Sequence, residues 1–503
     1  MTPESAYADM RARSRERSLL ASVSAVLGWD EQTYMPKHGA TLRGDQLGLL
    51  AGLEHERATD PRLGELLALV ERTDVIADPT GPEAANVREW RRAFDRQTKL
   101  PRDLVEALAR ATSAAQQAWV EARAAKNFAG FRPHLETIVG LKRREAECLA
   151  DGGDLYDALL DAFEPGARST DLASLFDDLR RDLVPLVDAI AGSPHRPDAT
   201  ILDRDYPVDR QRMFGEAVAA AVGFDFGRGR LDAAAHPFCS GFGPGDCRIT
   251  TRFNPRDLTQ SFFGILHEVG HGLYEQGLDP AHAGTPMGEA VSLGVHESQS
   301  RLWENLVGRS RPFWAYWLPM ARRVFRDALA EVDADAFYRA INAVKRSPIR
   351  VEADEVTYNL HIMVRFDLER ALIAGDLTPA DVPSAWNESY ARDLGITPAD
   401  DAEGCLQDIH WSAGLFGYFP TYTLGNVYAA QLHDAARRDL GDLDAAAARG
   451  DTGALLGWLR AKVHRQGQRL RAVDLVREAT GSAPERGPLV AGLRSKYGEI
   501  YGL

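Results

Sequence analysis

The chain has 503 residues, with 59 basic and 73 acidic side chains that give a formal net charge of −14 at neutral pH. Its 45% hydrophobic and 26% charged residues are ordinary for a soluble globular protein with a large core. The negative charge excludes nucleic acid and anionic membrane as favoured partners, because an acidic surface repels both.

The N-terminal segment 1–20 is polar and helix-prone, and the short apolar stretch after it is interrupted by polar residues. This pattern matches neither a signal peptide nor a membrane span. The four cysteines lack any Cys-x-x-Cys spacing, so we expect reduced thiols that fill space in a cytoplasmic protein. They are Cys148, Cys239, Cys247 and Cys405.

Helical periodicity dominates the rest of the chain. Apolar residues recur every three to four positions in the segments 61–72, 85–97, 101–126, 170–190, 312–329, 356–373 and 428–440. Pro101 and Pro133 occupy positions where helices are expected to begin. Alternation in 247–253 predicts a strand, and we expect only a few short strands, near 236–253.

The length allows about three domains, but we find no flexible linker and no repeat that would separate them. We therefore predict a single domain over residues 1–503. Within it we expect an N-terminal helical lobe over residues 1–200, a catalytic part over 230–430, and C-terminal helices that continue to residue 503.

One predicted helix carries the strongest chemical signal. It follows Asp257, which is typical of a helix N-cap, and contains the sequence HEVGH at 267–271. His267 and His271 are four residues apart, so a helix presents both imidazoles to one point. Glu268 is rotated by about 100° from the first histidine, which places its carboxylate beside that point. The pattern indicates a metal site.

A catalytic zinc ion takes three protein ligands and keeps one position for water. Tyr274 and Gly277 occupy the positions where a metzincin has a glycine and a third histidine, which excludes that class. The helical pattern of 294–306 favours an acidic third ligand, either Glu297 or Glu304, whereas His296 is expected beside the ligands. The full set of downstream candidates is His282, Glu289, His296, Glu297 and Glu304.

Further motifs occur in order along the chain: HPF (236–238), DCRIT (246–250), HESQ (296–299), IRVEAD (349–354) and GCLQDIHW (404–411). With HEVGH they resemble the carboxypeptidase Taq metallopeptidases over nearly the whole chain. The resemblance implies a mainly α fold, with a large helical saddle-like body, a deep active-site groove and a small β-sheet. This architecture is similar to that of the zincins related to neurolysin and angiotensin-converting enzyme. The resemblance also implies a cytoplasmic homodimer.

The resemblance implies that His267, His271 and Glu297 bind one Zn²⁺ ion per chain, with Co²⁺ as the alternative metal. Glu268 then acts as general base toward a metal-activated water. The implied activity is that of a metallocarboxypeptidase, which releases single amino acids from peptides with a free C-terminus. Arg301 occupies the position where many glutamate-liganded zincins have an aspartate, so the outer partner of His271 cannot be assigned by analogy.

By resemblance to related helical zincins, His410 and Tyr422 are expected to donate hydrogen bonds to the oxyanion that forms during peptide hydrolysis. Two alternatives stay open. Tyr418 lies four residues before Tyr422 and can serve instead, and His410 can be a structural residue packed on Trp411.

Recognition of a free C-terminus requires a group that binds a carboxylate, for which the planar fork of arginine is suited. Arg350 is our first candidate, because it lies in a family motif, and Arg248 is the second. Gln407 is expected to line or support the substrate groove, as are Asp246 and Thr250.

Two other functions remain possible at this point. The first is another HExxH peptidase mode, such as an oligopeptidase, a dipeptidyl carboxypeptidase or an aminopeptidase, although the chain lacks the Gly-x-Met-x-Asn stretch of the last. The second is a non-catalytic helical scaffold with a structural metal, but structural zinc normally has four protein ligands and no fourth is evident.

Overall fold

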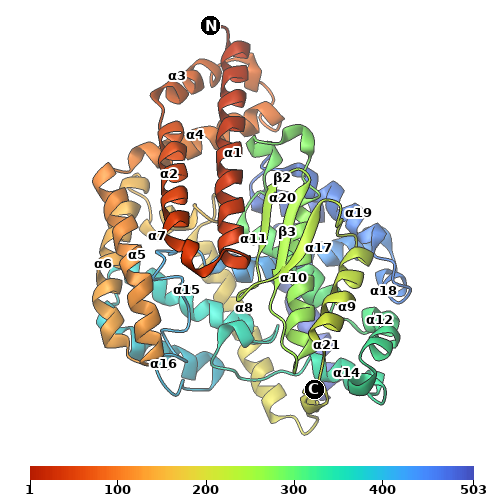
Figure 1. The fold of residues 1–503 in the computed structure, drawn as a ribbon. Helices are drawn as coiled ribbons and strands as arrows, with labels where there is room; N and C mark the ends of the chain where they lie inside the picture. The colour runs from red at the N-terminus through yellow and green to blue at the C-terminus, as the bar shows by residue number, and fades with distance from the viewer.

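Helices form nearly all of the regular structure in the computed structural model, which describes residues 1–503 (Figure 1). The predicted mainly α fold with a small sheet is confirmed. The N-terminal part consists of α1 (Pro3–Thr33), α2 (Ala40–Ala58), α3 (Pro61–Val70), α4 (Pro82–Lys99), α5 (Arg102–Ala124), α6 (Phe128–Leu149), α7 (Leu155–Leu160) and α8 (Ser169–Gly192).

The middle of the chain contains the sheet and the HEVGH helix. It consists of α9 (Val208–Ala221), β1 (Gly229–Ala233), β2 (Cys239–Gly243), β3 (Asp246–Thr251), α10 (Leu258–Glu275), α11 (Leu293–Arg301), α12 (Arg311–Val324), α13 (Arg326–Leu329), α14 (Ala334–Ile341), α15 (Tyr358–Ala374) and α16 (Val382–Leu394). The C-terminal part consists of α17 (Pro420–Leu440), α18 (Leu443–Ala447), α19 (Gly453–Lys462), α20 (Ala472–Thr480) and α21 (Gly487–Tyr501). None of the helices combines the length and the apolar character needed to cross a bilayer.

Two details of the predicted elements are wrong. Pro133 lies inside α6, which begins five residues earlier at Phe128. The apolar face of α6 already starts with Phe128 and Phe131, which are buried. Their packing makes the helix begin before the proline. The strands are expected near 236–253, and β1 lies before this region. Its five residues show no apolar alternation that would predict a strand.

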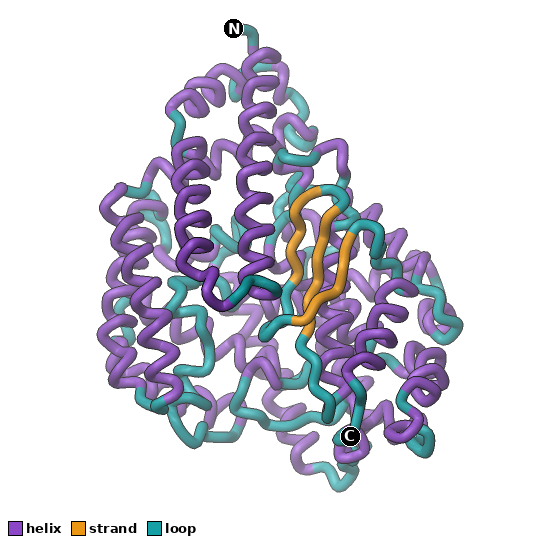
Figure 2. Tube along the Cα trace, in the orientation of Figure 1, coloured by secondary structure: helices purple, strands orange, loops and turns teal.

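The three strands form one sheet in the order β1-β3-β2 (Figure 2). The central strand β3 pairs with β1 in parallel and with β2 in antiparallel orientation. Helix α10 packs on β3, where Gly272 lies against Ile249 and a Cβ atom on the glycine would be 3.3 Å from the Ile249 side chain. The sheet thus supports the helix that carries HEVGH.

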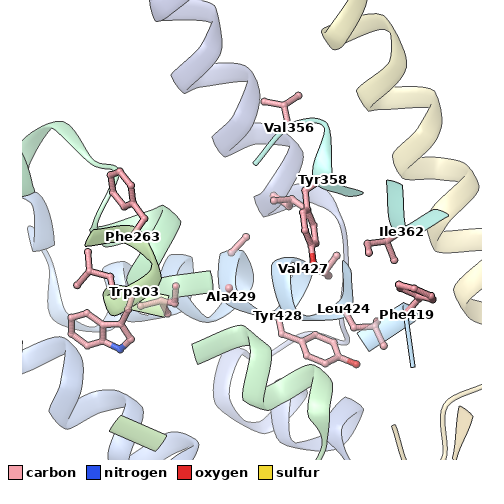
Figure 3. Close-up of a cluster of buried hydrophobic side chains, with 14 of the residues drawn as sticks. Phe263, Trp303, Val356, Tyr358, Ile362, Phe419, Leu424, Val427, Tyr428 and Ala429 are labelled. Carbon is pink, nitrogen blue, oxygen red and sulfur yellow. The ribbon is translucent and has the colours of Figure 1, made fainter. Parts of the chain in front are cut away.

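The main hydrophobic core contains 95 buried residues and continues through α10, the start of α11, α15 and α17. Figure 3 shows a part of it that includes Trp303, Tyr358, Val427 and Tyr428. A separate cluster of six buried residues joins α1, α3 and α4, among them Met10 and Leu66. The candidate ligands are therefore carried by helices that are anchored in the main core.

Helices α1 and α2 lie side by side and contribute nothing to the main core, although α1 supplies Ala6 and Met10 to the smaller cluster (Figure 1). Only Ala58 is buried on α2, and only three residues are buried on the 31-residue α1. The C-terminal end of α1 reaches the sheet, where the Trp29 ring lies 4.4 Å from the Arg248 guanidinium. Tyr34 donates a hydrogen bond of 2.5 Å to Asp232 on β1.

Candidate active site

The HEVGH segment lies on α10, as its spacing predicts. The Asp257 carboxylate caps this helix by accepting hydrogen bonds from the backbone N–H groups of Thr259 and Gln260, at 2.8 and 3.3 Å. On the other side of the helix an apolar stripe, formed by Phe262, Leu266, Val269 and Leu273, is buried. The helix is thereby fixed in rotation, with both histidines on the side that faces α11.

Two glycines let three helices approach closely around the third ligand. A Cβ atom on Gly270 of α10 would lie 2.4 Å from the backbone oxygen of Gln299 on α11. A Cβ atom on Gly425 of α17 would lie 2.5 Å from the Glu297 side chain. Because neither position can hold a larger residue without a shift of the helices, α11 sits directly between α10 and α17. This packing brings Glu297 to the two histidines.

Three potential ligand atoms converge on one point. The Oε2 atom of Glu297 lies 3.6 Å from Nε2 of His267 and 3.4 Å from Nε2 of His271. Ligand atoms at about 2.1 Å from a tetrahedral ion are about 3.4 Å apart, so the spacing fits one zinc-sized cation. All three atoms lie within 4.8 Å of one another. Two imidazoles and a carboxylate leave one tetrahedral position for water or substrate.

The charges around this point also favour a cation. Burial lowers the pKa of His267, but the negative charges of Glu297 and Glu304 outweigh it and raise this pKa to about 9. Burial, together with the positive charges of His296 and His267, lowers the pKa of His271 to about 4, so this histidine is neutral at pH 7 and has a free lone pair. The electrostatic field at this point therefore favours a positive charge. Two imidazole nitrogens and a carboxylate oxygen are donors that suit a divalent metal ion.

Glu304, the other acidic candidate for third ligand, hydrogen-bonds to the outer nitrogen of His267, with 2.9 Å between Nδ1 and Oε2. It lies on a π-helical turn, Leu302–Val307, which follows α11 directly. Although burial opposes ionisation, His267 and Arg301 lower the pKa of Glu304 to about 2. The ionised carboxylate accepts the Nδ1 proton and leaves the Nε2 lone pair for the metal.

We predict that Glu304→Gln weakens metal affinity about ten- to a hundredfold while the three ligands remain. The amide has no negative charge to orient and polarise the His267 ring. Titration of the metal-stripped protein with Zn²⁺ in a competing chelator measures the change. An unchanged dissociation constant contradicts this role, and Glu289→Gln, outside the cluster, is the matched control.

His271 has a different outer partner. Its Nδ1 atom lies 2.6 Å from Nδ1 of His296, whose Nε2 atom lies 2.9 Å from Oε1 of Glu275. A row from Glu275 through His296 thus supports His271, on the side of the ring away from Glu297. Arg301, found where the zincin analogy places an aspartate, instead donates to Oε1 of Glu297 at 2.7 Å. The other carboxylate oxygen of Glu297 stays directed at the histidines.

Glu268 is buried beside the metal group, with 5% of its surface exposed. Burial raises the pKa of its carboxyl group to about 7, and the negative charges of Glu297 and Glu304 add to this effect. A carboxylate with a pKa close to neutrality suits proton transfer in both directions.

Arg350 forms the centre of a second buried cluster. Its Nε and one terminal nitrogen contact Oδ1 of Asp408 at 2.9 and 2.8 Å, and Nη1 donates to the Tyr358 hydroxyl at 3.0 Å. Asp408 also accepts from Nε of Arg365 at 2.7 Å. Of the five N–H donors of Arg350, two have no partner. The guanidinium is held firmly and still has a fork available.

Gln407 supports this arginine from the backbone side. Its Oε1 atom accepts a 2.8 Å hydrogen bond from the Arg350 backbone N–H, and its amide nitrogen donates to the backbone oxygens of Pro348 and Glu403. Both ends of the Gln407 side chain are therefore used within the protein.

His410 and Tyr422 lie together, with 3.3 Å between Nε2 and the hydroxyl oxygen. The Tyr422 ring is 5.1 Å from the Arg350 guanidinium, so the structure brings these three sequence-predicted residues together. His410 packs on Phe419, at 4.3 Å between ring centroids, and its Nδ1 atom has no partner. Burial lowers the pKa of His410 to about 3, which keeps it neutral. The Tyr418 ring is also close, 5.4 Å from that of Tyr422.

Tyr358 connects the two clusters. Its ring lies 4.2 Å from the guanidinium of Arg301, which holds Glu297, and its hydroxyl accepts from Arg350. The metal ligands and the arginine fork are thus joined by a continuous series of contacts.

The structure places Arg248 elsewhere. It pairs with Asp246 at 2.8 Å and its guanidinium lies over the rings of Trp29 and Phe242, at the contact between the sheet and α1. Thr250 exchanges two hydrogen bonds with the backbone of Phe238 and so fixes the HPF segment. Cys239 and Cys247 are free thiols with 3.6 Å between their sulfur atoms.

Comparison with known proteins decides the family. The family model described as "Carboxypeptidase Taq (M32) metallopeptidase" matches residues 9–497. Thermostable carboxypeptidase 1 of Thermus thermophilus is 50% identical over 511 aligned positions, which cover 100% of both chains. The chain belongs to the carboxypeptidase Taq family.

Other members of the carboxypeptidase Taq family agree along the whole chain. Carboxypeptidase 1 of Bacillus subtilis is 37% identical, with 95% of each chain covered. The crystal structure of the M32 carboxypeptidase from Deinococcus radiodurans R1 matches with a TM-score of 0.95 and 42% identity, covering 99% of this chain and 100% of that one. This metallocarboxypeptidase therefore has the neurolysin-like fold of its family, and its metal group is His267, His271 and Glu297.

The motifs of the family left several functional contacts of this metallocarboxypeptidase unassigned. The sequence indicates no partner for Arg350, yet Asp408, in the motif GCLQDIHW, holds it. The sequence suggests Glu304 only as a metal ligand, because the π-helical turn that redirects this residue has no recognised sequence signal. Tyr358 follows the motif IRVEAD and gives no signal of its own.

Proposed function

We propose that this metallocarboxypeptidase binds one Zn²⁺ ion, with Co²⁺ as the alternative, at His267, His271 and Glu297. The distances of 3.4 and 3.6 Å between the ligand atoms support a small tetrahedral ion. When bound, the ion lowers the pKa of a water molecule and withdraws charge from the scissile carbonyl. Two neutral nitrogens and one carboxylate leave a net positive charge there.

Glu268 is the proposed general base. Its carboxylate takes the proton of the attacking water and passes it to the departing amine, which requires a pKa near neutrality. The pKa of about 7 that burial gives this group supports the assignment. Tyr422, with neutral His410 beside it, is the proposed donor to the oxyanion that forms on the carbonyl. Tyr418, which packs on both rings, is the alternative donor.

Arg350 is the proposed recognition group for the free C-terminus of the peptide. The observation that supports it is the unused fork of a buried guanidinium, since Asp408 and Tyr358 occupy only three of its five donors. A carboxylate fits such a fork with two parallel hydrogen bonds. Direct contacts through Tyr358 join this fork to the metal group, which supports recognition of the C-terminal end of the peptide there.

We predict that Arg350→Ala removes the preference for free-acid peptides over their C-terminal amides. Loss of the charge-assisted bond costs about 1.5–3 kcal/mol, or roughly ten- to a hundredfold in kcat/KM. Measuring kcat/KM on matched acid and amide peptides gives the preference directly. A general fall in rate does not decide the question, because the variant leaves Asp408 with only Arg365.

Arg248→Ala is the comparison variant, and it should keep the wild-type preference because Arg248 is engaged with Asp246 and Trp29. If Arg350→Ala still distinguishes acid from amide by the wild-type factor, the carboxylate is held elsewhere. If Arg248→Ala loses the preference for free-acid peptides instead, Arg248 on the sheet binds the terminal carboxylate.

We also propose a cytoplasmic homodimer. Large apolar side chains are exposed on the two N-terminal helices, among them Leu19 at 68%, Leu42 at 63% and Leu49 at 67%. Burial of such residues against a second copy gains hydrophobic free energy. Sedimentation equilibrium should give twice the 55.3 kDa mass of the chain, and the chain mass itself would contradict the dimer. The four free cysteines are consistent with a reducing compartment.

A further inference from the structure

A cavity of about 590 Å³ lies at the C-terminal end of α10, and none of the candidate active-site residues lines it. Its walls come from the loop before β1, the turn between β2 and β3, the residues after α10, the end of α19, and the turn that follows α19. Three arginines line it: Arg228, Arg460 and Arg465. The only acidic group in the wall is Asp225, and the only hydrophobic side chain is Leu278.

The three arginines of this cavity have no acidic partners. None of them has a carboxylate oxygen within 4.0 Å, although the protein has 73 acidic residues and forms many ion pairs elsewhere. Arg228 donates one hydrogen bond, from Nη1 to the backbone oxygen of Gln276 at 3.1 Å. The side chains of Arg460 and Arg465 make no hydrogen bond, so most of the guanidinium N–H donors remain available.

The positive charges act on one another. Burial lowers the pKa of Arg460, and the charges of Arg228 and Arg465 lower it further, with only Asp225 opposing them. Three guanidinium groups and one carboxylate leave a net charge of about +2. In a protein with a net charge of −14, such a local excess of positive charge costs free energy until an anion offsets it.

The wall of the cavity is held in place from within. The buried Gln276 side chain accepts from the Asp225 backbone N–H at 2.9 Å and donates to the Asp225 backbone oxygen at 3.0 Å. The loop that carries Arg228 is thereby tied to the end of α10. A fixed wall lowers the entropy cost of binding a ligand.

We propose that this cavity is a binding site for a small multivalent oxyanion of the phosphate class. Arginine forks match the oxygen geometry of phosphate, and a net charge near +2 matches its dianion. The near absence of apolar and aromatic wall residues argues for recognition of the charged group alone. Gln276 directly follows Glu275, which holds His296 on His271, so the anion binds at the end of the metal helix. This proposal does not depend on the proposed roles in peptide hydrolysis.

Isothermal titration of the metal-loaded protein with inorganic phosphate, in chloride buffer of matched ionic strength, tests the site. We expect saturable binding of one phosphate per chain. Each of Arg460→Gln and Arg465→Gln should raise the dissociation constant roughly ten- to a hundredfold, because each removes charge-assisted hydrogen bonds. Neither variant should lower the melting temperature without phosphate, since neither arginine has a partner to lose and each experiences repulsion.

Lys462→Gln is the matched control, because Lys462 is an exposed cation on the same helix end but does not line the cavity. The dissociation constant of Lys462→Gln for phosphate should stay within about twofold of the wild-type value, as expected for a distant screened charge. If Lys462→Gln weakens phosphate binding as much as the two arginine variants do, the protein attracts anions only in general and the cavity is not a specific site. Unchanged binding in Arg460→Gln would place the phosphate elsewhere, including at the metal, and no saturable binding would equally overturn the proposal.

Discussion

His271→Ala is expected to lose the metal and the peptidase activity together. The substitution removes one of only three protein ligands, and the remaining imidazole and carboxylate cannot hold a catalytic ion in fixed geometry. Activity should fall by at least about 10³-fold, because the ion supplies both water activation and charge stabilisation. Metal content after dialysis, measured by inorganic mass spectrometry beside turnover, gives both quantities for one sample.

His282→Ala is the matched control for this loss. His282 was one of the downstream candidates in the sequence, but the structure leaves it outside the metal group. This variant should keep one metal ion per chain and wild-type turnover. Full metal occupancy in His271→Ala would show that the ligand set is wrong, whatever its activity.

Glu268→Gln separates the chemistry from metal binding. The amide has nearly the same size as the carboxylate and is not a metal ligand, so one ion per chain should remain. It cannot accept the proton of the attacking water, and kcat should fall by at least about 10²-fold. The pair of measurements, metal content and kcat, distinguishes this outcome from the joint loss expected for His271→Ala.

Near-normal turnover of metal-loaded Glu268→Gln would remove this residue from the mechanism. Glu289→Gln makes the same chemical change outside the metal group and should retain both metal and rate. KM should change little in Glu268→Gln, since the proposed role is confined to the transition state.

The sequence predicts the helices and the two histidine ligands well, because both depend on local spacing. The i, i+4 histidines and the capping residue Asp257 follow from helical geometry alone, and α10 has them as expected. The choice of Glu297 over Glu304 needed the family resemblance. Spacing alone could not decide it, because the two residues occupy a segment that changes from an α-helix to a π-helical turn.

Contacts between segments that are distant in the chain cannot be predicted from local sequence patterns. The pairing of Arg350 with Asp408 joins residues 58 positions apart, and the row from Glu275 to His296 joins two helices whose approach depends on Gly270. The prediction that a helix begins at Pro133 is wrong, because tertiary packing of the preceding aromatic residues outweighs the local cost of an internal proline. In each case packing between elements decided the outcome.

Mass spectrometry of peptide products shows directly whether the protein removes single residues from the C-terminus. The metal-loaded protein is incubated with one peptide in three forms: both termini free, the N-terminus acetylated, and the C-terminus amidated. We expect a ladder that shortens by one residue at a time from the C-terminus, unaffected by acetylation and slowed by amidation. A ladder from the N-terminus, steps of two residues or internal fragments would contradict it.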